Sequence, residues 1–588
     1  MGIPSKAQLS SAFQSKDSFL EFIRVPDAPE GQTTVGKGRW SNRDLEPTPM
    51  EERTWKWYSL GTFWLTISFG ITGWNAAASL LASGMTWQQT FISCTLGCFI
   101  SALMVMVMAR PGVQYHLGFP VLCRSVMGMY GAFFFIFIRG VVCIIWFGVQ
   151  TYYAANLLSV CFRCMFGSSW ENWANALPAS AATTSKQILC FFIVWFVEAP
   201  LVFVHPNKIH WLYSLQGVIL PISTLGLFGW CMANGAGFNS LKLANEISET
   251  AQASTSLGWA IMNGINVILG TLSPMLVNQP DLARYCKNTR DAGWVQGLAL
   301  FCSKLLVFFL GLAATVSMQG VWGVAYWNVW DLLDAILDHY WTAAARTAVW
   351  LVAMTFILSC IGTNLGANSL PFGADIATFA PKYISIVRGQ VICAILSVVV
   401  QPWQLLLNAA KFLTFLGSYN IYMAPICSVW MVDYLLVRKG NLHTPSMYDG
   451  RRGSLYWFWS GVNWLGVAAW ACGMVTGLPG LVGALQPGSV SQAAIDLYKM
   501  GWLLSFVTAG TIYYVLRLFV KVKVHPPAYE SMPTTFEYMA KNGREGFFDG
   551  EREDGVVLSG NSSDIETANE QGPSKEKEVG ETRQEPGY

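Results

Sequence analysis

The sequence predicts an all-α, polytopic membrane protein with about 12 transmembrane helices. Of its 588 residues, 53% are hydrophobic and only 12% are charged, and the mean hydropathy is +0.38. Soluble domains carry about 25% charged residues, so most of this chain is expected to lie in a bilayer. Apolar runs near the ~20 residues that a span needs lie at 57–82, 88–109, 128–160, 188–205, 212–233, 256–279, 295–318, 347–378, 388–408, 411–437, 455–478 and 499–520.

The distribution of basic residues predicts how these spans are oriented. With the N-terminus in the cytoplasm, the inner loops carry Arg110, Arg124, Lys208, Arg284, Lys287, Arg290, Lys382, Arg388, Arg438, Lys439, Arg451 and Arg452. The outer loops carry fewer: Arg163, Lys186, Lys242, Lys411 and Lys499, with Arg346 at a border. Because short loops rich in lysine and arginine stay in the cytoplasm, we expect a multi-pass protein with both termini inside.

Polar segments at the two ends are expected outside the bilayer. Residues 1–54 form a cytoplasmic N-terminal tail. Residues 524–588 turn polar and become rich in Asp, Glu, Gly and Ser, so they cannot bury a core and are predicted to be a disordered cytoplasmic tail. Lysines such as Lys541 in this tail make a ubiquitin ligase adaptor a candidate partner. The simpler interpretation is a solubilising tail.

Polar side chains share one face of the third span. Arg139, Trp146 and Gln150 are separated by seven and four residues, which places them near one another on a helix. Polar groups at membrane depth indicate a functional site. For Arg139 we favour a structural role, with its side chain snorkelling to the near surface. For Trp146 and Gln150 we favour a ligand pocket, because a stacking indole and an amide fit a planar heterocycle.

Two spans contain helix-breaking residues. Span 57–82 contains the stretch 68–75, SFGITGWN, and span 256–279 contains Gly264, Gly270 and Pro274. Broken helices at corresponding positions of two halves mark the midplane site of a transporter. The alternative is that glycines in membrane helices permit close packing, and the sequence leaves both interpretations open.

Span 347–378 and the loop before it carry further candidates. Asn368 and Asp375 are seven residues apart and share a helical face. The preceding loop, 319–346, contains Trp322, Trp327 and Trp330 and predicts an interfacial amphipathic helix. This helix is expected to be a passive belt, with a lid as the alternative.

Other function classes are disfavoured by the motifs. The chain contains no HExxH, no GxSxG and no P-loop, which argues against a membrane-embedded enzyme and an ATP-driven pump. It also lacks a selectivity-filter repeat or ring of charge, which argues against a channel. With a net charge of +2 and no basic stripe, the sequence gives no indication of nucleic-acid binding or a metal site. A secondary transporter is the function that remains favoured.

Several motifs resemble those of one transporter family. They are NRDLEPTP at 42–49, RTW at 53–55, ARPG at 109–112, WFGVQTY at 146–152, PDLARY at 280–285, ANS at 367–369 and DY at 433–434. On these motifs, which occur in order over roughly residues 40–440, the chain resembles the nucleobase:cation symporter family 1, and within it the fungal uracil/allantoin permease (Fur-type) branch.

The resemblance implies a fold and an activity. The fold would be LeuT-like, with two inverted five-helix repeats in a transport core at 55–440 and two additional helices in 441–523. The activity would be import of a nucleobase or related heterocycle, such as uracil, allantoin or uric acid, across the plasma membrane. The family also includes thiamine and nicotinamide riboside carriers, which are the alternative. No cofactor is implied beyond the co-transported ion, for which a proton is favoured over sodium.

The resemblance also implies roles for single residues. Trp146 would stack on the substrate, Gln150 would hydrogen-bond to it, and Asn368 would bond the opposite edge of the ring. Asp375 resembles a gating or coupling residue, partnered by a basic residue of the 284–290 loop such as Arg284 or Lys287. Trp74 and Asn75 are candidates for additional pocket residues.

Overall fold

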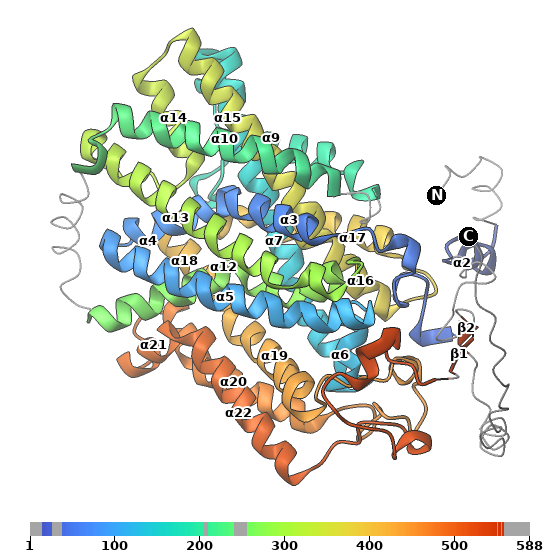
Figure 1. Cartoon of the computed structure of the whole chain (residues 1–588). Helices are drawn as coiled ribbons and strands as arrows, with labels where there is room; N and C mark the ends of the chain where they lie inside the picture. The colour runs from blue at the N-terminus through green and yellow to red at the C-terminus, as the bar shows by residue number, and fades with distance from the viewer. Residues whose placement is uncertain are drawn as a thin grey trace, which may run out of the picture.

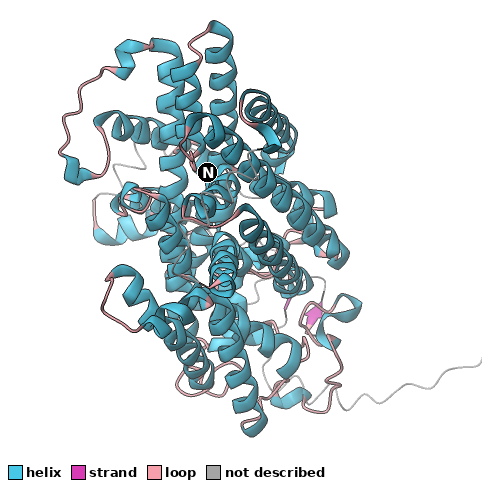
Figure 2. Ribbon diagram, turned by 90° about the vertical axis from the view of Figure 1, so that its left-hand side faces the viewer, coloured by secondary structure: helices cyan, strands magenta, loops and turns pink. Residues whose placement is uncertain are grey.

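The computed structural model of this chain describes residues 14–25, 38–204, 210–239, 256–549, 551–553 and 556–557. Over these residues the protein is almost entirely helical. The strands found there, β1 (Arg552–Glu553) and β2 (Val556–Val557), are two residues long and pair antiparallel. Figure 2 shows helices making up nearly the whole molecule. The predicted all-α class is confirmed.

The spans agree closely with those expected. In the described chain, 10 helices are long and apolar enough to cross a bilayer, and the bent pair α3–α4 makes 11. A further apolar helix, α17, has 14 residues and lies where the span 388–408 was expected.

The bounds of the helices follow the order of the chain. The first five spans are α3 (Trp57–Phe69) with α4 (Ile71–Ala82), α5 (Trp87–Tyr115), α7 (Gly131–Phe166), α9 (Ser185–Glu198) and α10 (His210–Asn234). The next five are α12 (Leu257–Ala283), α13 (Trp294–Trp322), α15 (Ala343–Thr363) with α16 (Leu370–Phe379), α17 (Ile386–Val399), and α18 (Ala409–Ser418) with α19 (Asn420–Val432). The last two are α20 (Trp464–Leu485) and α22 (Gly501–Phe519), and shorter helices are α2 (Lys16–Phe22), α6 (Phe119–Met127), α8 (Ser168–Glu171), α14 (Val329–His339) and α21 (Gln492–Lys499).

The helix pairs of the core follow a repeated pattern. The second span, α5, packs along the sixth, α12, and the first, α3, packs along the seventh, α13. The third span, α7, packs along the eighth, α15. If spans 1–5 correspond to spans 6–10, the pair of spans 2 and 6 corresponds to the pair of spans 7 and 1. The pair of spans 3 and 8 corresponds to itself. This symmetry is expected of two related repeats. Figure 1 shows these helices in the centre, with α20 and α22 packed together below them.

The first span is broken as predicted. Gly70 separates α3 from α4 in an extended conformation, with φ −65° and ψ 159°, and the two helices meet at an angle of 42°. For the sixth span the structure decides between the two interpretations, because α12 continues as one helix through Pro274 and Pro280. A second irregularity lies in the eighth span instead, where Asn364–Ser369 forms a π-helical turn between α15 and α16.

Close packing explains the glycines of the sixth span. A Cβ atom on Gly264 would collide with Ser93 Oγ of α5, and one on Gly270 would collide with the Leu416 carbonyl of α18. These glycines therefore let α12 approach its neighbours, which was the alternative interpretation.

The loop after α13 contains the expected helix, α14, but it is not a passive belt. The backbone N–H of Val329 donates to Asn75 Oδ1 at 3.2 Å, and the Trp330 ring lies 5.3 Å from that of Tyr153. Both Val329 and Trp330 are buried. One face of α14 is therefore fixed to α4 and α7 of the bundle.

The polar segments that flank the spans meet at one end of the molecule. Arg53 pairs with Glu545 through two hydrogen bonds of 2.6 and 3.0 Å, and Glu537 pairs with Arg110 at the end of α5. Met539 is fully buried beside them. Residues 525–549 are thus ordered, in contrast to the expected disordered tail, because their acidic side chains form ion pairs with buried or half-buried arginines. Residues 558–588 of that tail lie outside the described residues.

Candidate functional site

A small cavity lies beside the break in the first span. Its volume is about 30 Å³, enough for about two water molecules. Five spans line it, through Ile67, Gly70, Ile71, Thr72, Trp146, Gln150, Thr271, Pro274, Met275, Lys304, Thr363, Ala367 and Asn368. The cavity brings together Trp146, Gln150 and Asn368, which sequence reasoning had placed on two separate helices.

Trp146 and Gln150 form one wall of this cavity. Both project from α7, one helical turn apart. Trp146 packs against the rings of Phe415 and Tyr419, with centroid distances of 5.5 and 6.4 Å. The Nε2 of Gln150 donates to Thr72 Oγ1 at 2.9 Å. These contacts fix the indole and the amide relative to the break in the first span.

Asn368 reaches the cavity from the π-helical turn. Its Nδ2 donates to Asn364 Oδ1 at 2.8 Å, and Asn364 Nδ2 lies 3.1 Å from Glu198 Oε1. Glu198 is 1% exposed and also accepts from Thr151 Oγ1 at 2.9 Å. A chain of hydrogen bonds thus connects the cavity to a buried carboxyl group. The amide nitrogens of Gln150 and Asn368 donate to protein partners, and in the described part of the chain no hydrogen bond occupies their carbonyl oxygens.

An ionic centre lies on the same helix, α7, about two turns before Trp146 of the cavity. Arg139 donates to Asp375 through Nε at 2.9 Å and Nη2 at 2.5 Å, and its Nη1 donates to Asp281 Oδ2 at 2.5 Å. The guanidinium also lies 4.3 Å from the Phe119 ring. Arg139 is 0% exposed. One cation therefore joins α7 of the first repeat to α12 and α16 of the second.

The comparison with known proteins identifies the family. Residues 47–505 match the family described as permeases for cytosine/purines, uracil, thiamine and allantoin. The chain belongs to this permease family.

Curated relatives and solved structures agree with that assignment. The allantoin permease of Saccharomyces cerevisiae is 30% identical over 489 residues, covering 82% of this chain and 76% of the relative. The uracil permease of the same yeast is 29% identical over 521 residues, covering 88% and 81%. The fold resembles that of Mhp1, a nucleobase-cation-symport-1 family transporter solved in a closed conformation with bromovinylhydantoin bound, with a TM-score of 0.65 and 19% identity over 85% of this chain and 99% of Mhp1. The protein is thus a transporter rather than an enzyme, and the LeuT-like fold class is confirmed.

Two expectations about the ionic centre of this permease are wrong. Arg139 does not snorkel, because two carboxylates and an aromatic ring bind it inside the bundle. Asp375 does not pair with the 284–290 loop, because it is 2% exposed and faces Arg139 across the helix interface.

Neither Arg284 nor Lys287 is paired with Asp375 in this permease. Arg284 donates to Thr48 Oγ1 at 2.7 Å and to the carbonyls of Asp44 and Glu46 at 2.9 and 2.6 Å. The side chain of Lys287 is exposed. Arg284 therefore holds the N-terminal segment against the end of α12. A gating role for Asp375 remains a prediction, now with Arg139 as its partner.

Trp74 and Asn75 do not line the cavity. Trp74 packs against Gly311 of α13, where an added Cβ would lie 3.1 Å from it. Asn75 holds α14 through the backbone N–H of Val329. Both side chains of α4 thus support the walls of the site, and Thr72 of the same helix reaches the cavity instead.

Two ionisable residues near the cavity were missed from the sequence. Lys304 lies in the middle of the predicted span 295–318, and Glu198 lies in the span 188–205. An ionisable residue inside an apolar run is a functional signal by itself, and that signal was present for both.

Proposed function

We propose that this permease imports a flat, uncharged heterocycle that carries N–H groups, such as uracil or allantoin, together with a proton. The observation that carries the proposal is the cavity at which Trp146, Gln150 and Asn368 meet. An aromatic face favours stacking on a planar ring, and two amide oxygens on different helices suit N–H donors at its edges. The names of the yeast allantoin and uracil permeases support the same substrate class.

The volume of the cavity supports alternating access. About 30 Å³ is far below the ~300 Å³ at which ligand pockets begin. The cavity must therefore expand when a heterocycle enters. In LeuT-like folds, one helix bundle or repeat rocks against the other around the central site. The break at Gly70 lies at that boundary, where α4 can move relative to α3.

A carrier of thiamine or nicotinamide riboside is the second candidate. Relatives named thiamine transporter and nicotinamide riboside transporter 1 are each 27% identical to this chain. Both of those substrates contain a positively charged ring. Lys304 lines the cavity, and an ammonium there opposes entry of a second positive charge. The cavity therefore favours the neutral heterocycle.

Localisation and partners follow from the same proposal. We place the permease in the plasma membrane with both termini in the cytoplasm, where the tails can meet a ubiquitin ligase adaptor. The pairing of Arg53 with Glu545 at one end of the molecule supports a common side for the two flanking segments. Epitope tags at the two termini should be accessible only after permeabilisation of cells, and labelling of intact cells would contradict this orientation.

The experiment is a competition assay followed by four substitutions at three residues. Uptake of labelled uracil is measured against unlabelled uracil, allantoin, uric acid, thiamine and nicotinamide riboside. Trp146→Ala should abolish transport without loss of the protein from the membrane, while Trp146→Phe keeps part of it, because stacking contributes about 0.5–1.5 kcal/mol beyond burial. Gln150→Ala and Asn368→Ala should weaken binding or change the order of substrates, since an unpaired buried polar group costs about 1–3 kcal/mol.

Matched controls lie outside the cavity. Trp294→Ala removes an indole that is 68% exposed, and Gln492→Ala removes an amide that contacts the surface residue Asp496. Both controls should transport normally. Normal uptake by Trp146→Ala, with normal affinity in both amide variants, would remove these residues from the pocket.

A further inference from the structure

Lys304 is an ionisable side chain in the wall of the cavity, and no role in ion coupling has been given to it so far. It projects from the middle of α13 and is 1% exposed. It lines the same cavity as Trp146, Gln150 and Asn368. A buried lysine at membrane depth is costly unless a partner or a function retains it.

The surroundings of Lys304 provide no counter-ion. In the described part of the chain, its ammonium forms no ion pair of 4 Å or less. Its nitrogen lies 5.5 Å from the ring centroid of Phe308 on its own helix, within the range of a cation–π contact. The titratable groups that face it are the thiols of Cys94 and Cys98 on α5. Of the other elements that pack on α13, the helices α3 and α4, residues 211–234 of α10 and η6 (Gly237–Asn239) contain no charged residue. The turn η7 (Thr289–Ala292) carries Arg290 and Asp291, which lie before the start of α13.

The break in the first span lies directly beside this amine. A Cβ atom on Gly73 would lie 2.8 Å from the Ser68 carbonyl oxygen and 3.5 Å from Lys304 Nζ. The carbonyl end of α3 carries partial negative charge, and carbonyl ends of broken helices stabilise coupling cations in transporters of this architecture. The absence of a side chain at Gly73 lets the amine approach that end. When it is protonated, Lys304 therefore places a positive charge at the break, where a coupling cation would otherwise bind.

We propose that Lys304 carries the co-transported positive charge, as an ammonium when substrate is bound and as a neutral amine on the return. This inference rests on the proposed function, because it names the residue that couples the proton to the heterocycle. A proton from the outer side adds to the amine lone pair, and the same proton leaves to the inner side after the substrate. Lysine can complete this cycle because it loses its proton readily when buried, whereas arginine stays charged.

The test compares concentrative uptake with exchange in liposomes that contain the purified full-length chain in sodium-free buffer. The probe is labelled uracil, or labelled allantoin if uracil is not carried. With an inward proton gradient, the wild type should concentrate the probe, and uptake should depend on external pH. Lys304→Met should lose accumulation above the external concentration and lose the pH dependence. The exchange of labelled for unlabelled probe should be reduced less than accumulation, because exchange does not require the return of the empty carrier. Lys411→Met, on an exposed lysine of α18, should behave as the wild type.

Four results would overturn the inference. The first is accumulation by Lys304→Met with the wild-type pH profile. The second is loss of pH dependence in Glu198→Gln but not in Lys304→Met, which would assign the proton to the carboxyl group. The third is a strict requirement for sodium. The fourth result uses Lys304→Arg, which serves as the test if Lys304→Met is not recovered as folded protein. This variant is permanently charged, so proton-driven accumulation by it would overturn the inference. A wild type that carries no heterocycle at all would contradict the proposed function as well, which separates the two failures.

Discussion

Two buried arginine–aspartate centres of this permease differ in what they connect. In the first, Arg139 of α7 binds Asp281 of α12 and Asp375 of α16. In the second, Arg438 Nε donates to Asp433 Oδ2 at 2.9 Å, five residues away in the same segment. Both arginines are fully buried. The first ion pair crosses the boundary between the repeats, and the second stays within one helix end.

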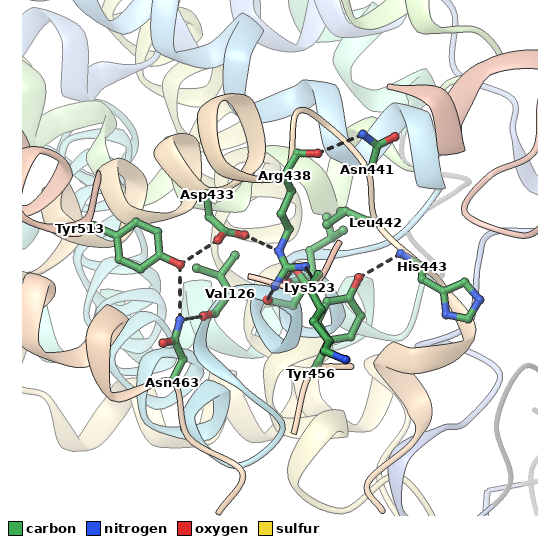
Figure 3. A network of polar contacts seen from close by, with 12 residues as sticks. Val126, Asp433, Arg438, Asn441, Leu442, His443, Tyr456, Asn463, Tyr513 and Lys523 are labelled. Atoms are coloured by element: carbon green, nitrogen blue, oxygen red, sulfur yellow. Dashed lines mark hydrogen bonds and ion pairs between the residues drawn. The ribbon is translucent and has the colours of Figure 1, made fainter. Parts of the chain in front are cut away.

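The ion pair of the second centre is surrounded by hydrogen bonds from neighbouring elements. Tyr513 of α22 donates to Asp433 Oδ1 at 2.7 Å, and Asn463 Nδ2 donates to the Val126 carbonyl at 2.5 Å. Figure 3 shows Asp433 held between Tyr513 and the Arg438 guanidinium, with Tyr456 beside the arginine. Arg438 also donates to the Ser125 carbonyl at 3.2 Å. These bonds attach the end of the tenth span to α22 and to α6.

The difference shows that burial alone does not define a gate. A salt bridge between two repeats must be broken or rearranged if the repeats rock, whereas the Arg438–Asp433 salt bridge within one segment can persist while the neutral hydrogen bond of Arg438 to the Ser125 carbonyl is exchanged. The Arg139 centre therefore affects the rate of transport, and the Arg438 centre affects stability. Four predictions test this distinction, starting with the largest effect.

Arg139→Gln should have the largest effect. It leaves Asp281 and Asp375 facing each other inside the bundle without a cation, and breaking a buried pair in this way costs about 3–5 kcal/mol. Thermal unfolding in detergent should show the loss of stability, and uptake should be abolished. Arg451→Gln is the control, because Arg451 is exposed and its pair with Asp449 is worth about 0–1 kcal/mol. Equal stability of the two variants would show that the Arg139 centre is not structural.

Asp433→Asn should reduce stability without changing transport per folded molecule. Asparagine keeps one acceptor oxygen for Arg438, its Nδ2 can donate to the Tyr513 hydroxyl, and Arg438 retains the carbonyls of Ser125 and Lys523. The expected cost is therefore smaller, about 1–3 kcal/mol. The checks are a melting curve and an uptake rate normalised to folded protein. A lowered normalised rate would place this centre in the transport cycle and remove the distinction between the two centres.

The sequence predicted the features that depend on local pattern. Span lengths, the break at Gly70 and the shared face of Trp146 and Gln150 follow from residue type and helical period, which neighbouring residues determine. Asn368 came from the family resemblance, and the structure adds that its amide is oriented by Asn364.

The sequence failed where the outcome depends on distant partners. Arg139 was expected to snorkel because its carboxylates lie 142 and 236 residues further along the chain. The role of the glycines of α12 stayed open between a break and close packing, because the sequence does not show that Ser93 and Leu416 pack against them. The same glycine can permit a break or a close approach, and only the neighbouring helix decides between them.

Asp375→Asn tests the first centre on the transport rate. The variant keeps one of the two acceptor oxygens for Arg139 and loses the charge, and Asp375 does not line the cavity. Substrate binding should therefore persist while transport slows about tenfold, which corresponds to about 1.4 kcal/mol in the barrier. Binding is measured by substrate-dependent stabilisation of the purified protein, and rate by initial uptake at several external pH values. A normal rate with a normal pH profile would leave Asp375 as a fixed helix-end carboxylate.

The smallest effect is expected at a third ionic site, where the flanking segments meet. Neither arginine centre contains a histidine, whereas His116, directly after α5, is 5% exposed and lies near Arg53 and Glu545. Its Nδ1 lies 3.2 Å from the Arg284 carbonyl oxygen. Burial, followed by the charge of Arg53, lowers the pKa of His116 to about 4, and Glu545 opposes this shift.

The sign of the pH effect follows from that lowered pKa. The unfolded chain, with a histidine pKa near 6.5, takes up a proton before the folded protein does. The contribution of His116 is therefore fully present above about pH 6.5 and is lost as the pH falls toward about 4. Between pH 7 and pH 6 the loss should be about 1 kcal/mol or less, seen as a lower melting temperature in detergent. His116→Gln should flatten this part of the pH profile, because its side chain does not titrate, whereas His339→Gln, at the end of α14, should leave it unchanged. An unaltered profile in His116→Gln would assign the acid sensitivity to another group, such as His525 after the last span, whose pKa is also lowered by burial.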